Sequence, residues 1–263
     1  MSKNTPHKQG SFCWIDLGTT DAASAKNFYG ALFGWTFVDL PTGGGGTYTM
    51  CKLEGADAAA FYELGPEQAG VSPHWMTYIA VDDVDQMSAR AREFGATILK
   101  APFDVMEVGR MAVLQDPSGA TISFWQGKQH FGVGTTREPG SLCWSELFST
   151  NPTKAGAFYA KTLEWETSSH DMGPMGTYTL FSRAGEGKQG QIGGMMAMPP
   201  HMAGVPSHWL TYFAVADVDA SAAQVAELGG KVVMPPQDIP NIGRFAIAQD
   251  PGGASFALYK NAH

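Results

Sequence analysis

The sequence repeats itself after about 130 residues, and this internal repeat limits the folds that the chain can adopt. The matching segments are FCWIDL (12–17) with LCWSEL (142–147), FYGALFGW (28–35) with FYAKTLEW (158–165), GTYTM (46–50) with GTYTL (176–180), SPHWMTYIAVDDVD (72–85) with PSHWLTYFAVADVD (206–219), and GRMAVLQDPSGATISFW (109–125) with GRFAIAQDPGGASFALY (243–259). The first three pairs lie 130 residues apart and the last two 134 apart. The chain is therefore predicted to hold two copies of one domain, residues 1–130 and 131–263, with four residues added between Leu180 and His208.

Each copy divides again into two similar units. In the first unit, a strand at 12–17 precedes a helical pattern at 19–34 that has an N-cap candidate in Thr20 or Asp21 and ends at Gly34. Three extended pieces follow, and the same order of strand, helix and three strands returns from residue 74. The whole chain is thus predicted to consist of four βαβββ units, which is an α+β arrangement.

Composition excludes several classes of partner. The formal net charge is −8 and the sequence pI is about 5.3, with no run of Lys or Arg, so neither nucleic acid nor a membrane surface is predicted as a partner. No segment approaches about 18 consecutive apolar residues, and the start is polar, so a cytoplasmic protein is predicted. Separately, the protein is expected to be a monomer or a homodimer. Three cysteines make no disulfide framework, and Cys13 and Cys143 are interpreted as small core residues.

The βαβββ units, the FYxxLxGW helix end and the GRxAxxxDPxGAxxxxW hairpin resemble the vicinal-oxygen-chelate superfamily, which includes glyoxalases, extradiol dioxygenases and bleomycin-resistance-type binding proteins. The sequence is most similar in character to tandem two-domain actinobacterial members described as glyoxalase-like or hydroxylases. The resemblance covers nearly the whole chain. It implies two glyoxalase-like domains, each a cupped mixed sheet that forms a partial barrel around a cavity. The fold alone does not set the function, because members of such a superfold bind metals, drugs or unrelated substrates.

The same resemblance implies which positions would hold a metal. Metal-using members place His, Gln or Glu near the start of the first strand of a unit and Glu on its last strand. The residues at those positions here are Trp14, Met76, Ser123, Trp144, Leu210 and Ala257. Trp, Leu and Ala have no lone pair to give, and Met and Ser are poor ligands for hard or borderline metals, so no metal and no cofactor are predicted.

His74 and His208 are a second possibility at these strands. Each lies two residues before one of those positions, and strand alternation places it on the same face. One imidazole per cup could bind a metal only with a carboxylate from Asp16 or Glu146, and such a site would fall short of three protein ligands. The alternative is that both histidines form hydrogen bonds near the mouth of a strand.

The acidic residues in the first strand of each copy are the main functional candidates. Alternation predicts that Phe12, Trp14 and Asp16 face the cup, while Cys13, Ile15 and Leu17 face away; Leu142, Trp144 and Glu146 are the inward set of the second copy. A carboxylate there costs several kcal/mol unless it is paired, hydrogen-bonded or protonated. One hypothesis pairs Asp16 with Arg110 and Glu146 with Arg244 as strand ties. The other makes the carboxyl a general acid or base, or a group that orients a ligand hydroxyl.

Aromatic residues share the predicted inward parity. They are Trp14, Tyr78 and Trp125 in the first copy and Trp144, Tyr212 and Tyr259 in the second. Such a lining suits a planar or polycyclic apolar ligand, although core filling would give the same pattern. Two glycine-rich segments, 41–46 and 184–206, are predicted to be mobile, and the second could be a methionine-rich lid or a loop folded over the neighbouring domain.

Three functions follow from these residues. The first is a metal-independent enzyme with a hydroxylase-, isomerase- or cyclase-type step on an aromatic or polyketide-like ligand, with Asp16 or Glu146 as acid or base. The second is a binding protein that sequesters such a compound. The third is a metal-dependent glyoxalase or dioxygenase, which the poor ligands at the metal positions disfavour.

Overall fold

A computed structural model describes residues 5–173 and 176–262, and these form two eight-stranded mixed sheets. The predicted outer limits of the two domains, residues 1 and 263, lie outside the described residues. The first sheet has the strand order β2-β3-β4-β1-β5-β8-β7-β6 and the second has β10-β11-β12-β9-β13-β16-β15-β14. The strands of the first sheet are β1 (Phe12–Thr19), β2 (Thr36–Pro41), β3 (Thr47–Leu53), β4 (Ala56–Glu63), β5 (His74–Ala80), β6 (Thr97–Val105), β7 (Gly109–Gln115) and β8 (Thr121–Gly127). Those of the second are β9 (Leu142–Ser149), β10 (Glu166–Asp171), β11 (Thr177–Ser182), β12 (Gln191–Ala197), β13 (His208–Ala214), β14 (Lys231–Ile239), β15 (Gly243–Gln249) and β16 (Ser255–Asn261).

One α-helix follows the first strand of every unit, as the sequence predicts. The helices are α1 (Ala22–Phe33), α2 (Val84–Glu93), α3 (Pro152–Leu163) and α4 (Val218–Glu227), and short 3-10 turns lie at η1 (Pro66–Gln68), η3 (Gly187–Gly190) and η4 (Pro200–Met202). Asp21, rather than Thr20, caps α1 by accepting a hydrogen bond from the Ser24 amide, and Gly34 ends it in the left-handed region with φ 71°. The α+β prediction of four βαβββ units is confirmed. None of these described helices has the length and apolar character needed to cross a membrane.

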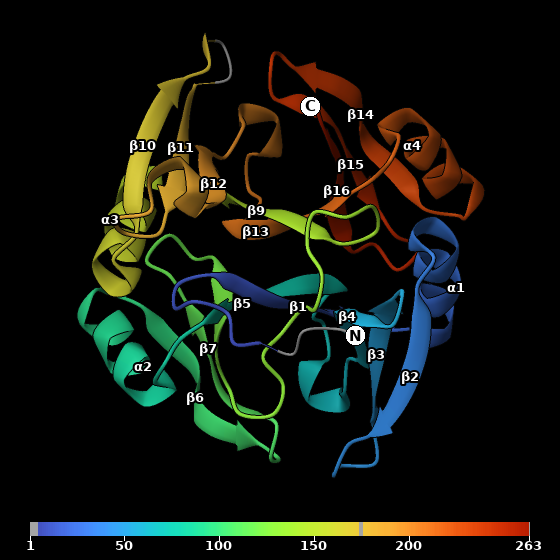
Figure 1. The fold of residues 1–263 in the computed structure, drawn as a ribbon, viewed down its shortest axis with the longest axis horizontal. Helices are drawn as coiled ribbons and strands as arrows, with labels where there is room; N and C mark the ends of the chain where they lie inside the picture. The colour runs from blue at the N-terminus through green and yellow to red at the C-terminus, as the bar shows by residue number, and fades with distance from the viewer. Residues whose placement is uncertain (1–4, 174–175, 263) are drawn as a thin grey trace.

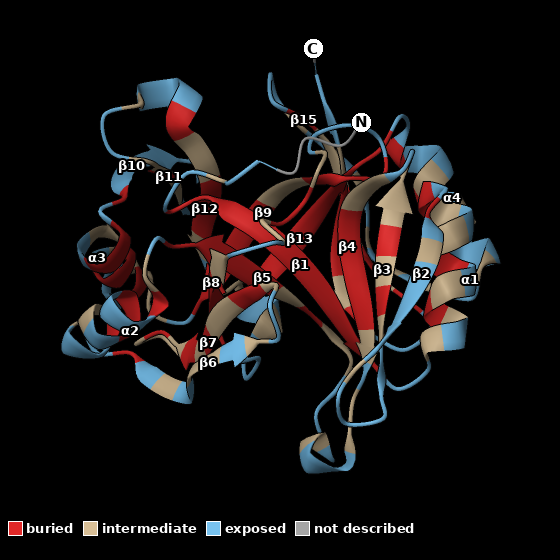
Figure 2. Cartoon of the chain, turned by 60° about the horizontal axis from the view of Figure 1, so that its bottom comes forward, coloured by how far each residue is buried: buried red, intermediate tan, exposed pale blue. Residues whose placement is uncertain are grey.

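The two sheets share their cores, which the sequence alone did not predict. In Figure 1, α1 lies beside α4 and α2 lies beside α3, so the first unit packs on the fourth and the second on the third. One buried cluster joins Phe28 and Tyr29 of the first half to Phe213 and Phe256 of the second. The other joins residues of β5–β8 and α2 to residues of β9–β12 and α3. Figure 2 shows the buried central strands between the more exposed helices.

Two hydrogen bonds cross between the halves in the same way. The Tyr29 hydroxyl donates to Asp250 Oδ2 at 3.1 Å, and the Tyr159 hydroxyl donates to Asp116 Oδ2 at 3.0 Å. Each tyrosine oxygen also accepts a hydrogen bond from an indole: Trp75 Nε1 donates to the Tyr29 hydroxyl at 3.0 Å, and Trp209 Nε1 donates to the Tyr159 hydroxyl at 2.9 Å. The helix tyrosine of each half therefore binds the DP turn of the other half.

Removing one of these hydroxyls should destabilise the whole molecule. Tyr159→Phe leaves Asp116 Oδ2 and the Trp209 indole without their buried partner, so we expect a loss of about 2 kcal/mol in the free energy of unfolding. Denaturant titration measures the loss. Tyr259→Phe is the matched control, because that half-buried hydroxyl donates only to the Ile242 carbonyl; equal losses in the two variants would contradict the prediction.

Strand alternation fails at one point in each half. A β-bulge at Cys13 shifts the register between β1 and β5, so Phe12 pairs with Ile79 while Trp14 pairs with Tyr78. Phe12 consequently packs in the shared core beside Trp165, and Cys13 joins the cluster around Trp14. A bulge at Cys143 turns Leu142 outward in the same manner. The predicted faces of these four residues were therefore wrong, whereas Trp14 and Trp144 lie on the inner faces.

The segment 184–206, predicted to be a mobile lid or a loop folded over the neighbouring domain, contains a strand that the sequence analysis did not predict. The middle of this segment, Gln191–Ala197, is β12, a strand hydrogen-bonded between β9 and β11. Register places the four added residues before Gly194, because Phe181 still matches Cys51 at an interval of 130 residues and Gly194 matches Ala60 at 134. The turn η3 at Gly187–Gly190 lies in this interval.

Candidate functional site

The inner face of the first sheet, which we call the first cup, has a carboxyl group near its centre. Asp16 lies between Ala60 of β4 and Met76 of β5, and its side chain is 3% exposed. The hydroxyls of Tyr78 and Tyr48 both donate to Asp16 Oδ2, at 2.8 and 3.0 Å. The other oxygen, Oδ1, has no hydrogen-bond partner among the described residues. Asp16 is thus held from one side, and its second oxygen is left for another group.

Burial sets the charge of this group. Desolvation raises the pKa of Asp16 to about 7, against the opposing effect of hydrogen bonds from Tyr78 and Tyr48. A carboxyl with such a pKa exchanges its proton near neutral pH. This is the property that general acid–base catalysis needs.

The raised pKa also predicts how stability depends on pH. The folded chain keeps the Asp16 proton between about pH 4 and pH 7, where the unfolded chain has already lost it, so this group favours folding at low pH and the benefit disappears as the pH rises to about 7. Asp16→Asn should therefore gain stability relative to the wild type by roughly 4 kcal/mol between pH 4 and pH 8. Urea titrations of both proteins across this range measure the change, and a difference that stays constant with pH would refute the assignment.

The inner face of the second sheet, the second cup, has the same arrangement around Glu146. This residue lies between Gly194 and Leu210, and its side chain is 6% exposed. The Tyr212 hydroxyl donates to Glu146 Oε2 at 2.5 Å. Desolvation raises the pKa of Glu146, and hydrogen bonds from Tyr212 and Tyr178 oppose the rise. Both predicted acids therefore point into their cups and away from solvent.

Tyr48 and Tyr178 complete the two sites and were missed by the sequence analysis. The Trp14 indole donates to the Tyr48 hydroxyl at 2.9 Å, and the Trp144 indole donates to the Tyr178 hydroxyl at 3.0 Å. Each cup therefore has a chain of polar contacts from indole to phenol to carboxyl. The signal was present, since GTYTM and GTYTL are among the repeated segments.

The predicted pairing of the two arginines with the cup acids was wrong. Arg110 Nε and Nη2 bind the two oxygens of Asp85 at 2.7 and 2.9 Å. Arg244 binds Asp219 in the same way and also Asp238. Side chains alternate between the two faces of a strand. Met111, which follows Arg110 in β7, faces the first cup, so Arg110 faces the side of the sheet on which the helices pack.

His74 and His208 lie at the mouths of strands, away from the acids. His74 Nδ1 lies 2.9 Å from the Ser72 carbonyl oxygen, and His208 Nδ1 lies 2.9 Å from that of Pro206. His208 also stacks on Phe148 with 5.5 Å between ring centroids. This is the hydrogen-bonded alternative given above, and a catalytic role for either residue stays a prediction.

The remaining predicted ligand-binding residues lie on the inner faces. Met76, Tyr78 and Trp125 belong to the side-chain cluster of the first cup, and Leu210, Tyr212 and Tyr259 to that of the second. Ser123, which pairs with Tyr78 across β5 and β8, is fully buried, and its hydroxyl has no partner among the described residues. Their role in ligand binding stays a prediction.

The connection between the sheets covers part of the first cup. Residues 128–134, which we call the strap, follow β8 and return across β1. The Val133 amide donates to the Cys13 carbonyl at 2.8 Å, and the Trp125 indole donates to the His130 carbonyl at 2.9 Å. The His130 ring lies edge-on to Trp14 with 4.4 Å between centroids. Gly132 allows this approach: its φ is +125°, and a Cβ there would lie 2.0 Å from the Cys13 oxygen.

The two cups differ in access as a result. Trp14 and Trp125 are 3% and 6% exposed in the first cup. Their counterparts in the second cup, Trp144 and Tyr259, are only half-buried. The second cup is therefore the more accessible of the two.

The profile of the Glyoxalase/Bleomycin resistance protein/Dioxygenase superfamily matches residues 11–124 and again residues 141–258. The chain belongs to this superfamily. The two matches correspond to the two sheets, so the resemblance of the repeated motifs to the superfamily is confirmed.

Curated relatives match this chain along nearly its whole length. The protein CFP32 of Mycobacterium tuberculosis (strain CDC 1551 / Oshkosh) is 42% identical over 264 residues, covering 100% of this chain and 99% of its own. The anthracycline biosynthesis protein DnrV of Streptomyces peucetius is 35% identical over 265 residues, covering 95% and 92%.

Solved superfamily structures are similar in fold. The Mn(II)-bound glyoxalase from Novosphingobium aromaticivorans has a TM-score of 0.66 at 15% identity, covering 96% of this chain and 82% of its own. The 2,3-dioxygenase LapB from Pseudomonas sp. KL28 has a TM-score of 0.65 at 15% identity, covering 98% and 95%. At this identity the likeness concerns the fold.

The cups do not fit a metal of the kind that superfamily enzymes use. No group of three or more His, Cys, Asp or Glu side chains suited to one ion occurs within residues 5–173 and 176–262. The register neighbours of Asp16 are Ala60 and Met76, and those of Glu146 are Gly194 and Leu210. These neighbours supply no hard ligand, and the tyrosine hydroxyls already occupy one oxygen of each acid.

Proposed function

We propose that this protein is a metal-independent enzyme that moves a proton on an aromatic or polyketide-like small molecule, with Glu146 as the acid–base group of the second cup. One observation carries the proposal: a buried carboxyl with a raised pKa lies among aromatic side chains, hydrogen-bonded to a tyrosine rather than paired with a cation. Functional sites are where such perturbed groups concentrate.

The lining of the second cup supports an aromatic ligand. Trp144, Tyr212 and Tyr259 offer ring surfaces, and Met196 and Met198 offer adaptable apolar surface. The relative DnrV is named for anthracycline biosynthesis, which concerns polycyclic aromatic compounds. The aromatic lining of the second cup and the name of this relative therefore both support an aromatic ligand.

The second cup is preferred over the first because of access. In the first cup the strap lies against Trp14 and Trp125, so a planar ligand would have to displace it. Trp144 and Tyr259 of the second cup are open to contact. Asp16 is then the buried counterpart of Glu146 in a covered cup.

The proposed step is a proton transfer. The carboxylate of Glu146 removes a proton from a C–H that is acidified by conjugation with a ligand carbonyl, and the resulting carboxylic acid returns it to another atom of the same ligand. The Tyr212 hydroxyl stabilises the carboxylate before and after the transfer. Such a cycle is balanced for an isomerase- or cyclase-type step, whereas a hydroxylase-type step would require an oxidant as well.

A binding protein without chemistry is the second candidate. The aromatic and methionine surfaces that favour an aromatic ligand would serve sequestration equally well. This candidate requires affinity but assigns no role to the buried acid.

Anthrone tests the two against each other, since it is a tricyclic ketone with an acidic methylene. We expect the protein to accelerate the exchange of the C10 protons for deuterium, followed by NMR, and to keep this activity after treatment with a chelator. Binding without acceleration would support sequestration, and a rate lost to the chelator but restored by Mn²⁺ would establish a metal-dependent enzyme.

A further inference from the structure

The strap shows how one cup of this fold holds a group that enters it. In the first cup, the ring of His130 lies 4.4 Å from that of Trp14 and 6.1 Å from that of Trp125, measured between centroids. At the mouth of the cup, Nε2 of His7 lies 3.1 Å from the carbonyl oxygen of Val133. A ring beside two indoles and a carbonyl oxygen beside His7 therefore occupy this cup.

The residue that corresponds to His7 in the second half is Arg137. The turns before β1 and β9 match, because the Ser11 amide donates to the carbonyl three residues earlier at 3.0 Å, and the Ser141 amide does the same at 2.9 Å. The two turns are 130 residues apart, as β1 and β9 are. Arg137 therefore stands where the first half places the residue that holds the carbonyl of the strap.

Arg137 is close to the lining of the second cup. The Cys143 side chain packs against the second-cup cluster, as Trp144 does, and its thiol donates to the Tyr212 carbonyl at 3.3 Å. Burial raises the pKa of this thiol to about 12, and the positive charge of Arg137 opposes the rise. Such an effect requires the guanidinium to lie near the thiol, so Arg137 borders the cup at Cys143.

The guanidinium of Arg137 is free to bind a ligand. It is exposed and forms no hydrogen bond or ion pair within residues 5–173 and 176–262. The aromatic donors beside it are occupied, since the Trp144 indole binds Tyr178 and the Tyr259 hydroxyl binds the Ile242 carbonyl. A ligand oxygen at the mouth of the second cup would therefore meet Arg137.

The second cup also lacks the acid that borders the strap in the first. There, Asp57 forms an ion pair with Lys52. Strand register places Gln191 and Ser182 at these two positions in the second cup. An amide and a hydroxyl leave the charge of Arg137 uncompensated on this side.

We propose that Arg137 donates to the carbonyl oxygen of the ligand in the second cup and stabilises the negative charge that this oxygen gains during the proton transfer. This inference rests on the proposed function of the second cup. When Glu146 takes the proton, the electron pair of the C–H bond passes into the ligand and the carbonyl becomes an enolate. When the proton returns to another atom, the charge leaves the oxygen. A donor placed where charge develops lowers the barrier.

The spacing along β9 suits such a ligand. Cys143 and Glu146 are three residues apart, which is about 10 Å along a strand. In anthrone, the carbonyl oxygen lies about 4 Å from C10, so contacts of about 3 Å at both ends give roughly the same span. Glu146 can thus meet the methylene while Arg137 meets the oxygen.

The test measures the exchange of the C10 protons of anthrone. Arg137→Met should lower the rate about tenfold or more and keep the dissociation constant within about threefold, because the lost contact strengthens as charge develops. Arg137→Lys retains the charge and should stay within about threefold of the wild-type rate. Added salt should narrow the difference between the wild type and Arg137→Met.

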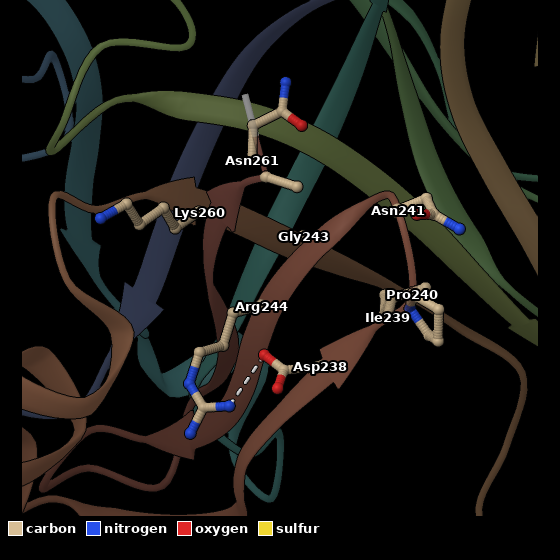
Figure 3. A pocket seen from close by; sticks show the side chains of 9 residues that line it. Asp238, Ile239, Pro240, Asn241, Gly243, Arg244, Lys260 and Asn261 are labelled. Atoms are coloured by element: carbon tan, nitrogen blue, oxygen red, sulfur yellow. Dashed lines mark hydrogen bonds and ion pairs between the residues drawn. The ribbon is translucent and has the colours of Figure 1, made fainter.

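Lys260→Met is the matched control. Lys260 follows Tyr259 in β16, so it faces the α4 side of the second sheet, where it lines a surface pocket with Arg244 (Figure 3). Like Arg137, it is exposed and forms no ion pair among the described residues. Its substitution removes the same charge without changing the cup, so the rate should stay within about twofold of the wild type.

2-Hydroxyanthraquinone gives a second measurement that needs no turnover. Its ionised oxygen resembles that of the enolate, and its visible absorption changes on ionisation. The pKa of the bound compound should be about one unit lower in the wild type than in Arg137→Met, because the guanidinium favours the anion. Absorption spectra of the complexes across pH measure this difference.

The outcomes separate this inference from the proposed function. An unchanged rate in Arg137→Met, an equal loss in Lys260→Met, or equal pKa values of the bound phenol would each overturn the role of Arg137, while a rate that depends on Glu146 would still support the proposed function. No acceleration by the wild type overturns both. Arg137 is exposed, so its variants are expected to fold, and an unchanged unfolding midpoint checks this.

Discussion

Glu146→Gln is expected to lower the rate of C10 exchange of anthrone by about 100-fold or more while the dissociation constant stays within about threefold. The amide has the shape of the carboxyl and can still accept the Tyr212 hydrogen bond. It cannot take up a proton at neutral pH. The loss should therefore appear in the rate and leave binding almost unchanged.

Asp16→Asn makes the same chemical change in the covered cup and so tests which cup works. If the second cup carries the reaction, its effect on the rate should be much smaller than that of Glu146→Gln. A larger effect of Asp16→Asn would assign the reaction to the first cup. Equal rates in both variants and the wild type would remove the carboxyl groups from the mechanism altogether.

The pH profile gives a further expectation for the same residue. Burial raises the pKa of Glu146, so the carboxylate that acts as base forms only as the pH rises through that raised value. The rate in the wild type should increase with pH through this range and then level off. The residual rate of Glu146→Gln should lack this step.

The sequence predicted the sheets because the repeat and the alternation of apolar residues are local signals. Strand alternation correctly placed Asp16 and Glu146 on the inner faces, where they are 3% and 6% exposed. The bulges at Cys13 and Cys143 were not predicted, since a single extra residue in a strand leaves no mark on composition. The bulges turned the side chains of Phe12 and Leu142 to the opposite face of the sheet and left the two acids on the inner face.

The partners of the acids could not be derived in the same way. Tyr48 and Tyr178 come from strands two places away in the sheet, so their distance from the acid depends on strand order rather than on spacing in the chain. Arg110 was assigned to Asp16 because a buried acid needs a partner, but two tyrosine hydroxyls meet that need. The strap, residues 128–134, spans the boundary that the sequence predicts between the two domains, and its fold over the first cup was not predicted.

The sharing of cores between the halves leads to the second large effect. We expect residues 1–136 and 137–263, expressed separately, each to lack a cooperative unfolding transition. Either half alone would expose the apolar side chains that it now buries against the other, including Phe28 and Phe256. Circular dichroism during denaturant titration measures this.

Mixing the two halves should restore the fold, because the cut between residues 136 and 137 lies in an exposed segment outside both sheets. Size-exclusion chromatography should show one species with both fragments, and the mixture should regain the transition of the intact chain. Phe256→Ala should weaken this assembly and lower the stability of the intact chain by about 3–5 kcal/mol, since its ring packs 6.0 Å from Phe28 and 5.7 Å from Tyr29 across the halves. Independent cooperative folding of either fragment would instead mean that each sheet is stable alone and that the shared core only joins two finished domains.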